Sequence, residues 1–332
     1  MPSLESSIFD RLQTGRYIAR FYHVTERGDG MRIGLHDADA AAVRNKTFPN
    51  YALMKLAAWH KQQGNRVEWW QPLGRYDAVY SSKVFSYTPE NPYLPVDAIR
   101  GGTGYDIKGK LPKAVDDMFP DYTIYPNTPY AIGYITRGCP NHCRWCIVPE
   151  KEGGIHPYRQ WNELVRSDSR ELVLMDNNIL ASDFGLEQLH GLVGSGYHID
   201  LNQGMDARLV TPEIAELLSR LDWMRFLRFS CDEISRLDAV LRTCELLEKC
   251  AVRPYRIFIY LLVTKDIEDA ALRVEHLTQM KGINLYAQAE RNDRLGIMPS
   301  KEQLQFVRYI YSGMFRKCTW SAWKTAHPGT KL

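Results

Sequence analysis

Residues 137–149 read R-G-C-P-N-H-C-R-W-C-I-V-P, and this stretch decides both the fold and the chemistry that we expect of the chain. Three of the seven cysteines, Cys139, Cys143 and Cys146, lie here with the spacing C-x3-C-x2-C. The apolar segment directly before them, Y-A-I-G-Y-I-T, is predicted to be a β-strand. The cysteine loop therefore follows the carboxyl end of a strand, which is where βα barrels place their active sites.

Further strands alternate with helical segments after the cysteine loop. Apolar residues at helical spacing indicate helices over 211–221, 237–250 and 267–282, and Thr211 followed by Pro212 is typical of a helix start. About six βα steps of this kind form a full or partial TIM-type barrel, and we expect the partial form over 130–295. The later strands are expected at 171–176, 197–203, 224–230, 255–263 and 283–289.

A second, smaller α/β series precedes the barrel. Strand-like segments begin with M-R-I-G-L-H-D, and a helix pattern runs from Asn50 to Gly64. The fold class is therefore α/β throughout. We expect four parts: an N-terminal extension over 1–30, with a short helix over 8–22 or partial disorder there, a flavodoxin- or Rossmann-like domain over 31–125, the partial barrel over 130–295, and a basic and aromatic helical tail over 296–332.

Composition and cysteine usage indicate a soluble protein of a reducing compartment. The chain has 332 residues, 45% of them hydrophobic and 24% charged, with a formal net charge of +3. No stretch approaches the roughly 18 apolar residues of a membrane helix, and the N-terminus lacks the plan of a signal peptide. An odd cysteine count with a tight triplet argues against a disulfide framework. We therefore expect a cytoplasmic protein without a membrane partner.

Three thiolates on one loop can bind a metal ion or a cluster. Structural zinc normally takes four ligands in two close pairs, and no second C-x2-C follows here. Three cysteines on a four-iron cubane leave one iron without a protein ligand, and a substrate can bind at that iron. The other four cysteines lack cluster spacing: Cys231, Cys244, Cys250 and Cys318. Cys244 and Cys250 lie on a helical pattern and are expected in the core.

The triplet resembles that of the radical S-adenosylmethionine (radical SAM) superfamily, with an aromatic residue, Trp145, before the last cysteine. The resemblance covers roughly 130–290. It implies a 4Fe–4S cluster bound by Cys139, Cys143 and Cys146, with S-adenosylmethionine on the fourth iron. Reduction by a donor such as flavodoxin or ferredoxin would give a 5′-deoxyadenosyl radical that abstracts hydrogen. It also implies an oxygen-sensitive enzyme, and Trp145 would supply an apolar or stacking wall.

The ends of the next strands offer further cofactor-binding residues. Where the family often has a Gly-Gly-Glu-like element, this chain has Asp176 and Asn177, which can accept hydrogen bonds from the methionyl amine or form a plain turn. Gln203 is expected to bond the ribose, and Arg208 the methionyl carboxylate, unless this loop only forms a surface ion pair. Ser230 and its neighbour Asp232 end the following strand and are expected to line the pocket.

The smaller domain resembles, in order and rhythm, the cobalamin-binding domain of some radical SAM enzymes. Their D-x-H-x-x-G signature is absent, and the nearest text is Leu35-His36-Asp37-Ala38-Asp39, so cobalamin is not expected. His36, Asp37 and Asp39 end a strand, where open α/β sheets bind ligands, or they serve the loop alone. The segment G-G-T-G at 101–104 forms a plain turn or cradles a phosphate.

We therefore expect a radical SAM enzyme that rearranges or methylates a C–H site of a small molecule, a peptide or, by preference, a nucleotide or base in nucleic acid. One alternative is a cobalamin-dependent methyltransferase, and another is a non-catalytic zinc-binding module for nucleic acid. The tail suits nucleic-acid contact by its mixture of bases and aromatics, or it packs on the barrel: Arg316, Lys317, Trp320, Trp323 and Lys324.

Overall fold

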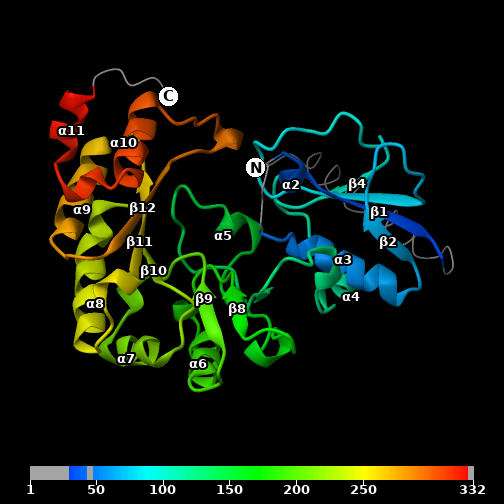
Figure 1. The fold of residues 1–332 in the computed structure, drawn as a ribbon, viewed down its shortest axis with the longest axis horizontal. Helices are drawn as coiled ribbons and strands as arrows, with labels where there is room; N and C mark the ends of the chain where they lie inside the picture. The colour runs from blue at the N-terminus through cyan, green and yellow to red at the C-terminus, as the bar shows by residue number, and fades with distance from the viewer. Residues whose placement is uncertain (1–29, 43–47, 328–332) are drawn as a thin grey trace, which may run out of the picture. The chain divides into compact units, whose positions relative to one another are not determined.

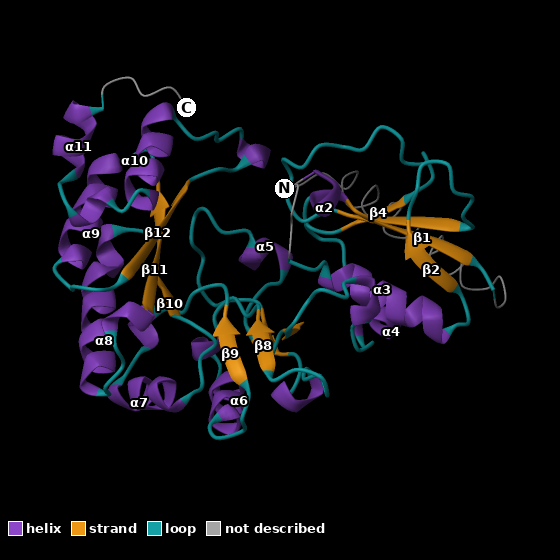
Figure 2. Ribbon diagram, viewed as in Figure 1, coloured by secondary structure: helices purple, strands orange, loops and turns teal. Residues whose placement is uncertain are grey.

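The computed structural model describes residues 30–42 and 48–327. Along the chain, helices alternate with strands that form parallel β-sheets, and this confirms the α/β class (Figures 1 and 2). The chain divides into two compact units, Met1–Thr128 and Pro129–Leu332. The helix suggested at 8–22 lies outside the described residues. Among the residues that the structure describes, no helix is both long and apolar enough to cross a membrane.

The first unit is built on a four-stranded sheet of order β2-β1-β3-β4 in which every neighbouring pair is parallel. Parallel strands need crossover connections, and short helices supply part of them here. The strands are β1 (Arg32–Asp37), β2 (Arg66–Trp69), β3 (Ala78–Ser82) and β4 (Ile99–Gly101). The helices are α2 (Ala38–Ala42), α3 (Tyr51–Gln62) and α4 (Lys113–Asp116).

Helix α3 shows how local sequence fixes this unit. The side chain of Asn50 caps it by accepting a hydrogen bond from the Leu53 backbone at 3.2 Å. Leu53 and Leu56 bury their side chains in one cluster with Ile33 of the sheet, and each such burial stabilises the fold by about 1.5–3 kcal/mol. Gly64 follows with φ +77°, a left-handed conformation that suits glycine. The expected helix is confirmed.

The second unit contains two three-stranded parallel sheets, of order β5-β8-β9 and β10-β11-β12. Isolated parallel bridges, Ile199 with Trp223 and Met205 with Phe229, join the region of β9 to that of β10. The described strands do not close into a barrel. The strands are β5 (Ala131–Gly133), β8 (Glu171–Leu174), β9 (His198–Leu201), β10 (Leu227–Ser230), β11 (Ile257–Val263) and β12 (Asn284–Ala289), with an antiparallel pair of β6 (Thr136–Arg137) and β7 (His156–Pro157).

Helices follow the parallel strands of this unit in turn. The predicted helix start at Thr211 is confirmed, because its hydroxyl accepts from the Ile214 backbone at 3.3 Å and Pro212 occupies the first turn. The helices are α5 (Val148–Lys151), α6 (Asp183–Leu192), α7 (Pro212–Arg220), α8 (Leu237–Lys249), α9 (Ile267–Thr278), α10 (Lys301–Tyr311) and α11 (Trp320–Ala326).

The two faces of the sheet β10-β11-β12 differ. Helices α8, α9 and α10 lie to one side of it in Figure 1. Alternate β11 residues such as Ile259 and Leu261 are buried in the core of the unit. The residues that alternate with them, such as Phe258 and Tyr260, are only half-buried. Because side chains alternate along a strand, these aromatic rings lie on the face opposite the core.

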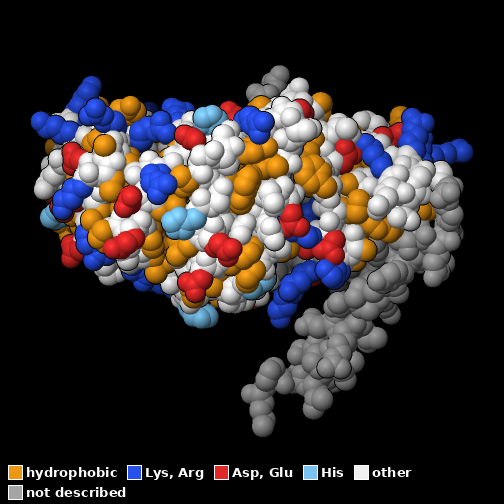
Figure 3. Space-filling model, turned by 90° about the horizontal axis from the view of Figure 1, so that it is seen from below, with side chains coloured by type: hydrophobic (Ala, Val, Ile, Leu, Met, Phe, Trp, Pro, Cys, Tyr) orange, Lys and Arg blue, Asp and Glu red, His pale blue; other side chains and the backbone are white. Residues whose placement is uncertain are grey.

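The C-terminal tryptophans belong to the core rather than to a surface. Trp320 and Trp323 are 6% and 4% exposed. Trp320 lies with its ring centroid 5.0 Å from Phe306, and Trp323 lies 5.7 Å from Tyr309. The structure thus favours packing over nucleic-acid stacking for these two residues. On the face drawn in Figure 3, Lys and Arg are interspersed with Asp and Glu, in keeping with the small net charge.

Candidate functional site

The base of the cysteine loop is closed by local contacts. The loop leaves β6, which pairs with β7, and the Cys139 amide donates to the Gly153 carbonyl at 3.1 Å. Gly138 has φ +80°, and a Cβ on it would lie 2.3 Å from the Gly154 carbonyl oxygen. Only glycine can occupy this position without moving the backbone. The three cysteines are therefore held on a loop of defined shape after β5.

A buried carboxylate, Glu152, ties the loop together. Its oxygens accept hydrogen bonds from the Arg137 guanidinium at 2.6 and 3.1 Å and from the Gly138 amide at 2.9 Å. A further bond comes from the Asn177 side-chain nitrogen at 2.9 Å. The Glu152 side chain is only 8% exposed, so these charge-assisted bonds carry weight. Asn177, predicted to bind cofactor, thus directs its amide nitrogen at the loop.

Asp176 supports the same loop from the end of β8. One carboxylate oxygen accepts from the Ile135 amide at 3.1 Å, and the other accepts from the Thr136 amide and hydroxyl at 2.5 and 2.7 Å. Burial raises the pKa of Asp176 to about 6, although these hydrogen bonds work in the opposite direction. The carboxylate predicted to contact a cofactor is therefore engaged with the strand end that carries the cysteines.

The neighbouring Asn178 is the residue of this turn that reaches the cysteines. It is 3% exposed, and its amide nitrogen lies 3.7 Å from the Cys139 sulfur. Its side-chain oxygen Oδ1 is buried and has no hydrogen-bond partner among the described residues. An unpaired buried carbonyl costs about 1–3 kcal/mol, so this oxygen is suited to accept from a ligand. The sequence contained the Asp-Asn-Asn turn but did not show which member faces the loop.

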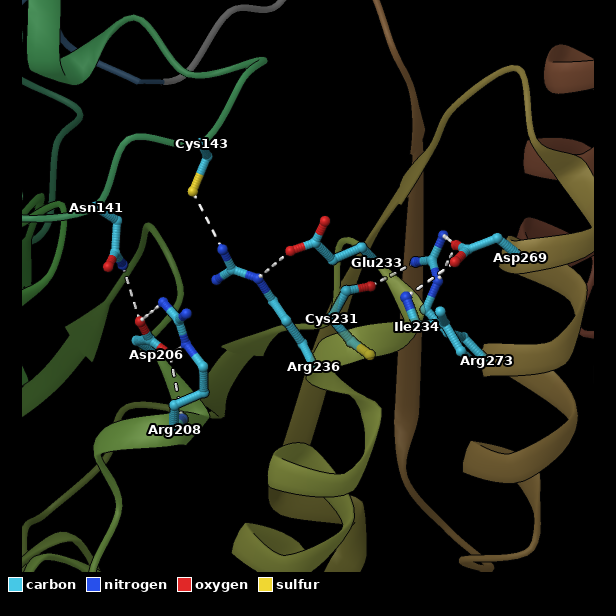
Figure 4. A network of polar contacts seen from close by, with 10 residues as sticks. All are labelled: Asn141, Cys143, Asp206, Arg208, Cys231, Glu233, Ile234, Arg236, Asp269 and Arg273. Atoms are coloured by element: carbon cyan, nitrogen blue, oxygen red, sulfur yellow. Dashed lines mark hydrogen bonds and ion pairs between the residues drawn. The ribbon is translucent and has the colours of Figure 1, made fainter.

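Each of the three cysteine sulfurs accepts an N–H hydrogen bond. The Asn141 amide lies 3.4 Å from the Cys139 sulfur, and the Val148 amide lies 3.5 Å from the Cys146 sulfur. Nη2 of Arg236 lies 3.2 Å from the Cys143 sulfur (Figure 4). Such donors stabilise thiolates and the sulfurs of iron–sulfur clusters.

These cysteines are not arranged around a single ion. Over residues 30–42 and 48–327, no three His, Cys, Asp or Glu side chains are placed to hold one metal ion. A zinc site needs its ligands to converge on one point, whereas in a cubane each thiolate binds its own iron. Three thiols, each with an N–H donor at its sulfur, are the kind of donor set that an iron–sulfur cluster takes.

Arg208 forms the ion pair that the sequence left open. Its guanidinium binds both oxygens of Asp206, at 2.9 and 2.7 Å, and the Asn141 side chain donates to the same carboxylate at 2.9 Å (Figure 4). Burial alone would raise the pKa of Asp206, but the bonds from Arg208 and Asn141 outweigh it and lower the pKa. The Arg208 side chain remains 44% exposed and can also reach a ligand.

A cavity of about 370 Å³ lies beside the cysteine loop. Trp145 forms part of its wall, while Ser230 and Gln203 are not among its lining residues. Burial raises the pKa of the lining carboxyl Asp232, opposed by the charges of Arg236 and Arg273. Four of the nine lining residues carry carboxyl groups, which can accept hydrogen bonds from hydroxyl or amine groups. Two of these carboxylates are already paired, Glu233 with Arg236 and Asp269 with Arg273. The lining residues are Arg144, Trp145, Asp232, Glu233, Ile234, Ser235, Thr264, Asp266 and Asp269.

In the first unit, His36 is buried in a polar network. Its ring nitrogens lie 2.9 Å from the Ser81 hydroxyl and 3.3 Å from the Asn91 amide nitrogen, and its ring meets Trp70 edge-on. Burial lowers the pKa of His36, against the pull of neighbouring Asp37 and of Glu90. Coordination of cobalt by His36 would require it to leave one of these nitrogen partners.

The other ligand candidates of the first unit are also engaged. Asp37 accepts from the Tyr125 hydroxyl at 2.7 Å, and Asp39 accepts from the Val84 amide at 2.7 Å. In the glycine-rich turn, the Gly104 amide donates to the Lys83 carbonyl at 2.9 Å. These contacts favour the structural alternatives: a loop role for Asp37 and Asp39, and a plain turn for the glycines.

Comparisons with known proteins do not assign the chain to a family. Searching the sequence against models of protein families gave no match. Searching it against curated proteins gave no match either.

Proposed function

We propose that the protein is a radical SAM enzyme. One observation carries the proposal: three cysteines at C-x3-C-x2-C spacing follow the first strand of a parallel βα series, and each sulfur accepts an N–H hydrogen bond. The cavity beside Trp145 and the unpartnered Oδ1 of Asn178 offer room and an acceptor next to that loop. These features support a cluster that binds S-adenosylmethionine at its open iron.

In this proposal Cys139, Cys143 and Cys146 hold a 4Fe–4S cluster. When bound and reduced, that group supplies the electron that splits a sulfonium and yields a carbon radical. Asp176 and Glu152 fix the loop, because their carboxylates take hydrogen bonds from its backbone and from Arg137. The carboxylates of the cavity suit the cationic, hydroxyl-bearing S-adenosylmethionine, and Trp145 suits its planar base.

The proposal extends to the finer fold. Six parallel strands in chain order, with bridges from the region of β9 to that of β10, support a partial βα barrel. The order β2-β1-β3-β4 of the first unit supports a flavodoxin-like domain, whose usual order begins the same way. We propose a cytoplasmic enzyme that takes its electron from a flavodoxin or ferredoxin.

We propose a nucleotide, or a base in nucleic acid, as the substrate, and one cluster of rings favours this class. The rings of Phe258, Tyr260 and Tyr286 are mutual neighbours, with centroids 5.2, 5.7 and 6.0 Å apart, on the sheet face opposite the core. Tyr286 is 39% exposed, and its ring lies 5.3 Å from that of Tyr311. Aromatic rings presented in this way stack on bases with roughly 1–3 kcal/mol per base.

The reaction tests the proposal directly. Anaerobically reconstituted protein is reduced with dithionite in the presence of S-adenosylmethionine, and 5′-deoxyadenosine is measured by mass spectrometry. We expect its formation by the wild-type chain and its loss when all three loop cysteines are replaced by alanine. Equal amounts from both proteins, or none from a protein that has taken up iron and sulfide, would contradict the proposal.

The substrate class is tested in the same assay. Nucleosides, nucleotides and oligonucleotides carrying deuterium at their C–H positions are compared with deuterated amino acids and peptides. Deuterium that appears in 5′-deoxyadenosine identifies the molecule from which hydrogen was abstracted. Transfer from a nucleotide or oligonucleotide supports the substrate class, and transfer from a peptide or a non-aromatic metabolite refutes it.

A further inference from the structure

Arg236 contacts the cysteine loop from the segment between β10 and α8, which is distant from the loop in sequence. It is 8% exposed. Nη2 donates to the Cys143 sulfur at 3.2 Å, and Nε lies 3.4 Å from a carboxylate oxygen of Glu233 (Figure 4). The buried Arg236 guanidinium therefore donates one of its hydrogen bonds to the Cys143 sulfur. In the proposed function this sulfur is an iron ligand.

The three cysteine positions differ in their charged surroundings. Cys143 has Arg236 in hydrogen-bond contact, and Arg208 interacts electrostatically with the same thiol. Cys146 instead interacts with the carboxyl of Asp232. Two guanidinium groups therefore lie at the Cys143 corner of the loop, each paired with a carboxylate: Arg236 with Glu233 and Arg208 with Asp206. Guanidinium groups keep their charge at any ordinary pH, so this asymmetry is permanent.

We propose that Arg236 raises the reduction potential of the cluster through its hydrogen bond to the Cys143 sulfur. This inference rests on the proposed function, because it requires a cluster on the three cysteines. The step is a one-electron transfer: a donor such as dithionite or flavodoxin loses one electron, and the cluster gains it. Its negative charge grows by one, and a nearby cation stabilises the reduced form more than the oxidised form.

Glu233 works in the opposite direction. Its carboxylate is 46% exposed and pairs with Arg236, so it partly offsets the positive charge that faces Cys143. Removing the Arg236 charge should lower the potential, and removing the Glu233 charge should raise it. A merely structural role of either residue would not produce shifts of opposite sign, so the two variants together distinguish electrostatic tuning from loop distortion.

The test measures the midpoint potential of the reconstituted cluster by redox titration followed by electron paramagnetic resonance. We expect Arg236→Gln to make the midpoint potential about 59 mV more negative. For one electron this corresponds to a roughly tenfold change in the reduction equilibrium constant. Arg236→Lys, which keeps a charge, should shift the potential less, and Glu233→Gln should shift it to more positive values. Arg225→Gln is the matched control: this exposed arginine lies over the Phe226 ring and should leave the potential unchanged.

Iron and sulfide are counted in every variant first. An unchanged or more positive potential in an Arg236→Gln protein with full iron content overturns the inference and leaves the proposed function standing. If Arg236→Gln does not take up the cluster, the Glu233→Gln protein is measured in its place. An unchanged or more negative midpoint potential in Glu233→Gln overturns the inference. If the wild-type chain takes up no cluster, the proposed function fails and this inference fails with it.

Discussion

The guanidinium of Arg236 donates a hydrogen bond to the sulfur of Cys143 at 3.2 Å, across 93 residues of sequence. The cysteine loop is therefore held from two sides. Glu152, directly after α5, and Asp176, after β8, bind its base, while Asp206 and Arg236 contact it from the segments that follow β9 and β10. These contacts hold the loop that carries the three sulfurs, and the predictions for Glu152 and Asn178 concern this loop.

Replacing Glu152 with glutamine should weaken both the fold and cluster uptake. The carboxylate accepts from Arg137, Gly138 and Asn177 while almost fully buried, so loss of its charge leaves Arg137 without its ionic partner. We expect a loss of about 3 kcal/mol in the free energy of unfolding, measured with denaturant, and a lower iron content after reconstitution.

Glu150→Gln is the matched control, two residues earlier on helix α5, which Glu152 caps at its C-terminus. Its carboxylate pairs with Arg294, and both side chains are close to half-exposed. Exposed ion pairs contribute about 0–1 kcal/mol, so this variant should unfold and take up iron like the wild type. Equal losses in both variants would show that Glu152 does not clamp the loop.

Asn178→Ala should weaken the binding of S-adenosylmethionine to the reconstituted protein. The buried Oδ1 lacks a protein partner, and a new hydrogen bond there is worth about 1.4 kcal/mol, or tenfold in affinity. Calorimetric titration measures the change. Asn177→Ala, whose amide donates to Glu152 instead, should retain more of the affinity. Wild-type affinity in Asn178→Ala would refute a ligand role for this oxygen.

His60 should make the protein sensitive to acid. It is fully buried on α3, Nε2 has no hydrogen-bond partner within the described part of the chain, and burial lowers its pKa to about 4. The folded state therefore binds this proton more weakly than the unfolded state, whose pKa is about 6.5. The contribution of neutral His60 to the free energy of unfolding is fully present above pH 6.5 and is lost as the pH falls toward 4.

The variant His60→Phe should remove this dependence. Between pH 7.5 and pH 5 the wild type should lose about 2 kcal/mol of unfolding free energy relative to His60→Phe, because the histidine must remain neutral in the folded core. Denaturant unfolding at the two pH values measures the difference. Parallel losses in both proteins would show that another group causes the acid sensitivity.

Tyr286→Leu should weaken the binding of nucleosides. Stacking on an exposed ring contributes about 1–3 kcal/mol, so we expect roughly tenfold lower affinity in a fluorescence titration with adenosine, guanosine, cytidine and uridine. Tyr255→Leu is the control, because Tyr255 is 62% exposed and lies outside the ring cluster of Phe258, Tyr260 and Tyr286. This variant should bind as the wild type does. Absence of nucleoside binding by the wild type would remove this substrate class.

Local signals predicted the elements but not all of their roles. The cap at Asn50, the start at Thr211 and the apolar run of β11 are encoded within a few residues, and the structure has each of them. The position of the cysteine loop after a short strand could also be predicted, because the strand and the loop are adjacent in sequence.

Contacts between distant segments could not be predicted. The periodicity of β8 shows where it ends, but not that Asp176 turns back onto Thr136 while Asn178 faces Cys139. The sequences around Arg236 and Cys143 do not indicate that these two residues are in contact. Gln203, chosen for its place after a strand, is exposed, because strand ends alone do not fix the direction of loop side chains.

The central claim is that Cys139, Cys143 and Cys146 hold a cubane with one iron open to S-adenosylmethionine. Its most direct test is the count of iron and acid-labile sulfide per chain after anaerobic reconstitution, with electron paramagnetic resonance of the reduced protein. We predict about four of each in the wild type, a signal that changes when S-adenosylmethionine is added, and loss of both in the triple alanine variant. A wild-type chain that retains no more iron than that variant, or that binds one zinc instead, would contradict the claim.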